Sequence, residues 1–178
     1  MPDSDLLEAV NDAPDGLIAP ANDIFDRVAV EAEIERAADE APDAAAIRKA
    51  TVAALNAAQT HGRNLIKAQF LAKPRAAREA VQSYAWLTDC LVQTVFRVAV
   101  KRLHPQPNPT ASQKMAVLAV GGYGRFEMAP YSDVDLLFLT PYKITSWAES
   151  VIESMLYILW DLRLKVGHSS RTIRDCIR

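Results

Sequence analysis

Two aspartates, Asp133 and Asp135, stand one residue apart where an apolar run, Val134 to Leu139, begins. Side chains alternate across a strand, so a strand here would point both carboxylates to the same side. Two carboxylates at such a short separation repel each other unless a cation neutralises them or one becomes protonated. Mg²⁺, which binds one or two carboxylates plus phosphate oxygens, suits this spacing. In the alternative interpretation, Asp133 caps a turn after Ser132 and Asp135 faces solvent. If the two aspartates were the only evidence, this alternative would be favoured.

A glycine pair, Gly121 and Gly122, precedes the aspartates and comes directly after a short apolar run, Met115 to Val120. Glycines let the backbone approach a ligand closely, and free amides at a helix start can hold phosphate. The spacing is neither that of a Walker A loop nor that of a dinucleotide fingerprint. The order strand, glycine pair, short helix, acidic strand predicts a phosphate cradle beside a metal site, at neighbouring strand ends.

The stretches VGGYGRFEMAPYSDVDLLFL and LWDLRLKVGHSSRT resemble the bacterial PII uridylyltransferases, which are also uridylyl-removing enzymes. These belong to the nucleotidyltransferase superfamily of the DNA polymerase beta type. The resemblance covers about Met115 to Cys176, and the helices expected before it are in keeping. It implies an α+β fold of the polymerase beta-like nucleotidyltransferase kind, with a small mixed sheet preceded by an α-helical hairpin.

The resemblance also implies an activity and its site. Gly121 and Gly122 would bind the triphosphate of UTP, and Asp133 and Asp135 would coordinate Mg²⁺. UMP would pass to a tyrosine hydroxyl of the nitrogen-regulatory PII protein, with release of pyrophosphate. In such an in-line attack the protein mainly positions the reactants and stabilises charge. A related enzyme with another nucleotide or acceptor, or a non-catalytic nucleotide-binding module, remains an alternative.

A third carboxylate is expected from the same resemblance, on a later strand and flanked by apolar residues. Asp161, between Trp160 and Leu162, fits that local pattern. An ordinary acid at the end of a helix is an equal alternative, and the third acid could also lie beyond Arg178.

Other polar residues near these motifs have two interpretations each. Arg125 reaches phosphate or forms a surface ion pair with Glu127. Ser132 is expected to shape the turn before the aspartates and to help bind the ligand. His168 and Arg171 belong to the VGHSSRT stretch and could line the cleft, although a hydrogen-bonded histidine at a strand end is favoured over a general base.

The elements that position these residues begin with two helices. Pro42-Asp43 predicts a helix start, and the Ala-rich stretch from Ala44 to Leu71 predicts a long helix. A second helix is expected from Lys73-Pro74 to about Leu103, with apolar positions every three or four residues. We expect the two to pair as an antiparallel hairpin that covers one side of the strands later in the chain.

A proline-rich break then leads into alternating strands and helices. We expect strands at Met115 to Val120, Val134 to Leu139 and Arg163 to Gly167, an amphipathic helix at Trp147 to Leu162, and another helix from Thr172. We therefore divide the chain into an acidic, largely disordered arm (1–40), a helical hairpin (41–104), a linker (105–113) and a nucleotidyltransferase core (114–178) that we expect to be incomplete at its C-terminus.

Charge is distributed unevenly along the chain. Residues 1–40 hold twelve acids and two bases, a net of −10, and the remainder carries +8, which together give −2. The arm is expected to be disordered apart from one short helix over Ile24 to Ala38. The basic remainder suits an anionic ligand or an acidic partner, although a solvated basic surface is an equal interpretation.

Several protein classes are excluded at this stage. Cys90 and Cys176 match no metal or redox spacing and are expected to be reduced thiols. The first residues show no signal peptide, and every apolar run is shorter than the ~20 residues of a membrane span. We therefore expect a cytoplasmic protein that binds neither membrane nor nucleic acid.

Overall fold

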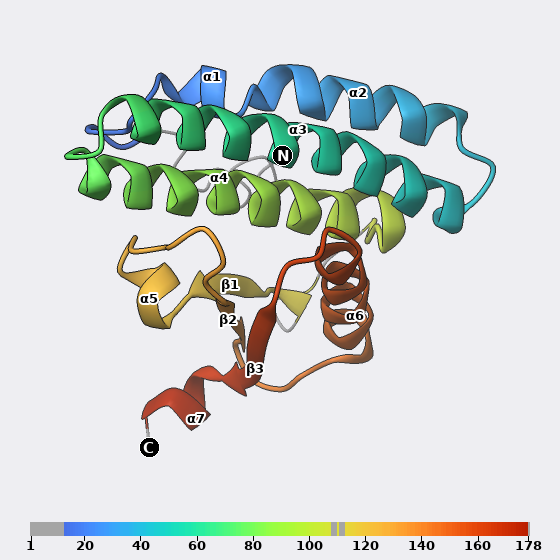
Figure 1. The fold of residues 1–178 in the computed structure, drawn as a ribbon. Helices are drawn as coiled ribbons and strands as arrows, with labels where there is room; N and C mark the ends of the chain where they lie inside the picture. The colour runs from blue at the N-terminus through green and yellow to red at the C-terminus, as the bar shows by residue number, and fades with distance from the viewer. Residues whose placement is uncertain (1–12, 108–109, 111–112, 178) are drawn as a thin grey trace.

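The structure, a computed structural model, describes residues 13–107, 110 and 113–177. Figure 1 shows two layers, a row of long helices above a small sheet with α6 beside it. The helical layer contains α1 (Ala21–Ile24), α2 (Arg27–Glu40), α3 (Ala44–Ala72) and α4 (Ala77–Val98), which continues as a π-helical turn, Ala99–Leu103. The sheet layer contains β1 (Ala116–Ala119), α5 (Gly121–Gly124), β2 (Val134–Thr140), α6 (Ser146–Asp161), β3 (Val166–Thr172) and α7 (Ile173–Ile177). This is the predicted α+β class, with a helical hairpin before a small mixed sheet.

Helices α3 and α4 form the predicted hairpin (Figure 1). Asp43 caps α3 as expected, because its side chain accepts a hydrogen bond from the Ala46 N–H at 2.8 Å. The start predicted for the second helix is wrong by a few residues. Lys73 to Ala76 form a turn, closed by the Ala76 N–H donating to the Lys73 carbonyl at 3.0 Å, and α4 begins at Ala77.

The prediction of a largely disordered arm is wrong for residues 13–40, whereas the helix expected over Ile24 to Ala38 is confirmed as α2, which runs from Arg27 to Glu40. Residues 1–12 lie outside the described part of the chain. Helices α1 and α2 pack on α3 (Figure 1). The few large apolar residues of this segment that are fully buried, Ile24, Phe25 and Ile34, lie in the same core as α3 and α4. A sparse apolar pattern suffices here because the partner helices supply most of the buried surface.

The acidic face of α2 also finds its counter-charges within the chain. Glu31 pairs with Arg97 of α4, and Glu35 and Asp39 pair with Arg102, the latter at 2.9 Å. All five side chains are partly exposed, so each pair contributes at most about 1 kcal/mol. Part of the basic surplus, which was assigned equally to an anionic ligand or partner and to a solvated surface, is thus neutralised by the N-terminal segment itself.

The sheet has the order β1-β2-β3, with β1 antiparallel and β3 parallel to the central strand β2. Helix α6 connects β2 to β3. The third strand begins later than predicted, at Val166, and runs on to Thr172. Its start is delayed because Arg163, with φ of 59°, and Leu164, whose N–H donates to the Leu159 carbonyl at 3.1 Å, still close the end of α6.

The side chains on one face of β2 are buried in the core, and those on the other face, called the open face here, are only half-buried. Val134, Leu136 and Phe138 are buried, and so is the apolar face of α6, the helix predicted to be amphipathic: Ile152, Met155, Leu156 and Leu159. Asp135 and Leu137 alternate with the buried residues and are half-buried on the opposite face. The central strand therefore presents Asp135 on its open face, as the alternation of the sequence predicts.

The structure describes both cysteines and the helices, which bear on the expectations of reduced thiols and of no membrane span. Cys90 is buried, Cys176 is exposed, and both are free thiols. Within the described residues, no helix combines the length and apolar character needed to cross a membrane.

Candidate functional site

Asp135 lies in a slot between two glycines. On one side is Gly121, directly after Val120, whose N–H donates to the Asp135 carbonyl at 3.0 Å. On the other side is Gly167, the partner of Asp135 in the parallel pairing with β3. A Cβ atom at Gly121 would stand 2.9 Å from Asp135 Oδ2, and one at Gly167 would stand 2.4 Å from Oδ1. Real Cβ atoms do not approach so closely, so both positions need glycine to leave room for the carboxylate.

The glycine turn differs from the predicted arrangement in one respect. The sequence predicts a helix that starts after the glycine pair, but the single helical turn α5 consists of the glycine-rich residues themselves. Gly121 has φ of +63°, a left-handed backbone conformation that residues other than glycine rarely adopt. A Cβ at Gly124 would lie 2.6 Å from the Ala119 carbonyl oxygen. These glycines therefore have structural reasons of their own, and phosphate binding by Gly121 and Gly122 stays a prediction.

Asp133 is the exposed member of the acid pair, and it comes directly after a tight turn. Ser132 shapes this turn as expected: its Oγ accepts from the Ala129 N–H at 2.9 Å, and its own N–H donates to the Ala129 carbonyl at 3.1 Å. Asp133 and Asp135 flank Val134, the buried first residue of β2. One carboxylate is thus held in the slot and the other is presented to solvent.

The donor set suits a cation that takes few protein ligands. Among the described residues no three His, Cys, Asp or Glu side chains are grouped to hold a metal ion. Mg²⁺ usually needs only one or two carboxylates, and substrate phosphates and water complete its shell. The Asp133 and Asp135 pair, with space preserved around Asp135 by two glycines, fits that requirement.

Asp161 does not occupy the place expected of a third carboxylate. It is the last residue of α6 and is exposed, whereas the resemblance implies an acid on a strand. The alternative interpretation, an ordinary acid at a helix end, describes its position. Within the described residues, Asp161 does not join Asp133 and Asp135 in a group of three acids that could hold a metal ion.

Arg125 lies at the rim of the glycine turn and forms the ion pair named as its alternative. Its Nε donates to Glu127 Oε2 at 3.1 Å, and both side chains are about two-thirds exposed, at 66% and 65%. Its Nη1 also donates to the Gly121 carbonyl at 3.0 Å. The guanidinium therefore closes the turn next to Asp135, and contact with phosphate stays a prediction.

The register of β3 separates His168 from Arg171. Arg171 is the partner of Leu139, so it shares the open face with Asp135. His168 is the partner of Leu136 on the core face, and its ring meets the Phe138 ring edge-on, with centroids 6.4 Å apart. Arg171 is therefore the member of the pair on the side of the site.

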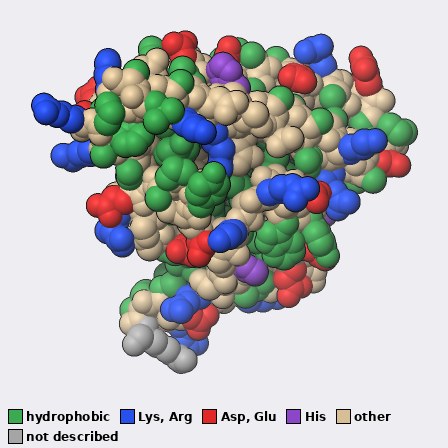
Figure 2. All heavy atoms as spheres, in the orientation of Figure 1, with side chains coloured by type: hydrophobic (Ala, Val, Ile, Leu, Met, Phe, Trp, Pro, Cys, Tyr) green, Lys and Arg blue, Asp and Glu red, His purple; other side chains and the backbone are tan. Residues whose placement is uncertain are grey.

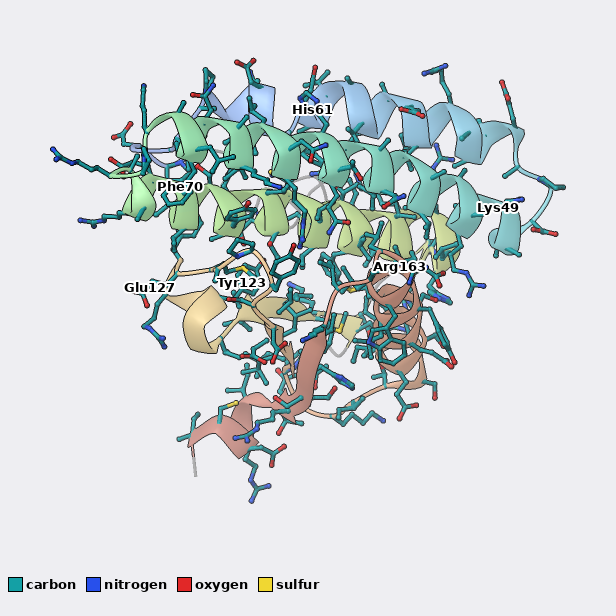
Figure 3. The ribbon with its side chains drawn as sticks, viewed as in Figure 1. Lys49, His61, Phe70, Tyr123, Glu127 and Arg163 are labelled. Atoms are coloured by element: carbon teal, nitrogen blue, oxygen red, sulfur yellow. The ribbon has the colours of Figure 1, made fainter. Side chains whose placement is uncertain are left out.

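Two residues of the site were missed by the sequence analysis. Gly167 stands in the VGHSSRT stretch, but its role needs the register that pairs it with Asp135. Tyr123 is buried at 4% exposure and lies between α5 and α4 (Figure 3). Its hydroxyl donates to Asp89 Oδ1 at 2.6 Å. Burial raises the pKa of Tyr123 well above its ordinary value and also raises the pKa of Asp89.

In the space-filling view, acidic and basic side chains meet over the sheet, below the helical layer (Figure 2).

Comparison with known proteins agrees with this arrangement. Residues 6–165 match the family described as glutamate-ammonia ligase adenylyltransferase. The chain belongs to this nucleotidyltransferase family. The chain is 63% identical over 155 residues to the bifunctional uridylyltransferase/uridylyl-removing enzyme of Ruegeria pomeroyi, and the match covers 87% of this chain and 17% of the relative.

Two further relatives carry the same name. The enzyme of Cereibacter sphaeroides is 56% identical over 167 residues, with 92% of this chain and 18% of the relative covered. That of Azospirillum brasilense is 47% identical over 132 residues, with 74% and 14% covered. The resemblance to the uridylyltransferase/uridylyl-removing enzymes is thereby confirmed, and this chain spans less than a fifth of the length of these relatives. No solved structure matches it significantly.

Proposed function

We propose that this chain performs the chemistry of a PII uridylyltransferase, transferring UMP from UTP to a tyrosine hydroxyl of the PII protein and releasing pyrophosphate. The sequence matches to these relatives cover most of this chain, and the names of the relatives support uridylyl transfer. Because the chain spans less than a fifth of those relatives, the reaction of the whole protein is part of the proposal. We expect the protein to act in the cytoplasm on UTP and PII, without nucleic acid or membrane.

The slot around Asp135 is the observation that carries this proposal. Because Gly121 and Gly167 carry no Cβ, the carboxylate fits between them on the open face of β2, and a side chain at either position would displace it. The alternation of side chains predicts that Asp133, directly before β2, supplies a second carboxylate on the same side. A fixed acid needs no reorganisation when charge develops beside it, which is the main way a protein stabilises a phosphoryl transition state.

In the proposed reaction the tyrosine oxygen attacks the α-phosphorus of UTP, and the bond from that phosphorus to the bridging oxygen breaks. Pyrophosphate leaves with the electron pair, and the hydroxyl proton is released to solvent. Mg²⁺ held by Asp133 and Asp135 would neutralise phosphate charge and favour the deprotonated hydroxyl. Arg125 and Arg171 supply positive charge beside the slot and on its face, respectively. These residues would orient the phosphates for in-line attack.

Adenylyl transfer from ATP is the second candidate. It is favoured by the description of the matched family, which names an adenylyltransferase. Both reactions place the same demand on Asp133 and Asp135, since only the base of the nucleotide and the acceptor differ. The choice between them therefore depends on nucleotide and acceptor preference and not on the acid pair.

Calorimetric titration with UTP and with ATP, each with and without Mg²⁺, tests the proposal. We expect Mg²⁺-dependent binding of UTP that is lost in Asp133→Asn and in Asp135→Asn. Asp161→Asn is the matched control, because it removes an exposed carboxylate outside the pair, and we expect it to bind like the wild type. Mass spectrometry of PII incubated with the protein and both nucleotides identifies the transferred group. Attachment of AMP would replace the uridylyl proposal by the adenylyl one, and failure of the wild type to bind either nucleotide would refute both.

A further inference from the structure

The glycine turn beside the Asp135 slot is tied to the helical layer by a partly buried hydrogen bond. Tyr123, the third residue of α5, donates through its hydroxyl to Asp89 Oδ1 of α4 at 2.6 Å. A single helical turn has little stability of its own, because nucleation fixes several dihedrals for one hydrogen bond. The conformation of Gly121 to Gly124 therefore depends on tertiary contacts such as this one.

The surroundings of Asp89 show that this contact is specific. Burial raises the pKa of the carboxyl, while the hydrogen bond from Tyr123 and the charge of Arg27 lower it. Arg27, at the start of α2, donates to Gln93 Oε1 at 2.6 Å and stacks over the Trp86 ring at 5.9 Å from its centroid. A carboxylate buried in a helix face is costly unless it is hydrogen-bonded and compensated in this way.

The position of Tyr123 in the turn connects this contact with the slot. It stands between Gly122 and Gly124, and its ring is held in the core. Gly121, two residues before it, comes so close to Asp135 Oδ2 that no Cβ fits between them. Movement of the turn away from α4 would therefore open one wall of the slot and free the Asp135 carboxylate.

We propose that Tyr123 and Asp89 are positioning residues, whose hydrogen bond holds the Gly121–Gly124 turn against β2 and so fixes Asp135 for the ligand. The effect on the ligand rests on the proposed nucleotidyl transfer. The effect on the turn does not, because it concerns only the protein. The two parts can therefore be measured separately.

Hydrogen exchange of the turn amides in the full chain tests the first part. Four of these amides donate within the turn, those of Gly124, Arg125, Phe126 and Glu127. We expect Tyr123→Phe, which removes only the hydroxyl, to speed their exchange by about tenfold, which corresponds to roughly 1.4 kcal/mol. The control is Thr94→Val, which removes another buried hydroxyl of α4 that donates to the Cys90 carbonyl at 2.8 Å. It should leave the exchange of the turn amides unchanged.

Variants of Asp89 separate positioning from general stability. Asp89→Asn keeps an oxygen that accepts from the Tyr123 hydroxyl and should restore slow exchange in the turn, whereas Asp89→Leu should not. Calorimetry with Mg²⁺ and UTP should show about tenfold weaker binding for Tyr123→Phe and Asp89→Leu than for Asp89→Asn and Thr94→Val.

Each outcome decides one part. If the turn amides exchange alike in wild type, Tyr123→Phe and Asp89→Leu, the hydrogen bond does not hold the turn and the proposal is overturned. If exchange speeds up but the affinity for UTP is unchanged, the link to Asp135 is wrong. If the wild type does not bind UTP, the proposed function fails, while the exchange result still decides the positioning role. If Tyr123→Phe fails to fold, the comparison of Asp89→Asn with Asp89→Leu gives the same decision.

Discussion

Replacing Gly167 by alanine would place a methyl carbon 2.4 Å from Asp135 Oδ1. Ordinary van der Waals contact begins at 3.4 Å, so one of the two groups must move by about 1 Å. The methyl carbon is attached directly to the backbone of β3, which pairs with β2 over its whole length, so it cannot easily move. The carboxylate is at the end of a side chain and will therefore be the group that moves.

The size of the effect can be worked out from that displacement. Swinging a carboxylate oxygen by about 1 Å takes the side chain roughly 30° from its rotamer, which costs about 0.5–1.5 kcal/mol. Alanine also loses less conformational entropy than glycine in a strand, by about 0.5–1 kcal/mol, so the net loss of stability should be below about 1 kcal/mol. Metal ligands, in contrast, must lie within about 0.2 Å of their proper distances. We therefore expect Gly167→Ala to weaken Mg²⁺-dependent UTP binding at least tenfold and to slow transfer about a hundredfold.

Titration calorimetry measures the affinity, and urea denaturation measures the stability of the same samples. Ser169→Ala is the matched control, since Ser169 is the next exposed residue on the same face of β3 and pairs with Leu137. It should change neither quantity by more than the experimental error. If Gly167→Ala binds Mg²⁺ and UTP as tightly as the wild type, the slot does not orient Asp135 and the reasoning from its geometry is refuted.

Two other predictions concern the end of α6 and the two cysteines. Arg163 has φ of 59° at the end of α6, so Arg163→Gly should relieve left-handed strain and raise the free energy of unfolding by about 1 kcal/mol in urea denaturation, and a loss of stability would contradict this. Burial raises the pKa of the Cys90 thiol to about 11, so at pH 8 a thiol reagent should modify the exposed Cys176 alone in the native protein and both cysteines in denaturant, whereas rapid modification of native Cys90 would contradict its burial.

The fold was predictable wherever local signals were strong. The helix from Ala44 to Leu71 was indicated by a capping aspartate and an Ala-rich sequence, and the central strand by an apolar run that only Asp135 interrupts. The N-terminal arm was mispredicted because its high acidity masks a few apolar residues. Those residues become a core contact only when α3 and α4 lie beside them. Charge pairing with Arg97 and Arg102 is likewise a property of the assembled helices.

For the site, the sequence alone determined the residue types and their alternation. Asp135 lies on the open face of β2 because side chains alternate along a strand, and the same alternation predicts that side for Asp133. Only the tertiary structure decided what surrounds them. The sequence does not encode strand order in any local pattern, yet strand order brings Gly121 and Gly167 to either side of Asp135. It also leaves Asp161 away from the acid pair, because α6 extends to this residue and no strand carries it. Local periodicity fixes which way a side chain points, whereas its neighbours depend on packing between segments that are far apart in the chain.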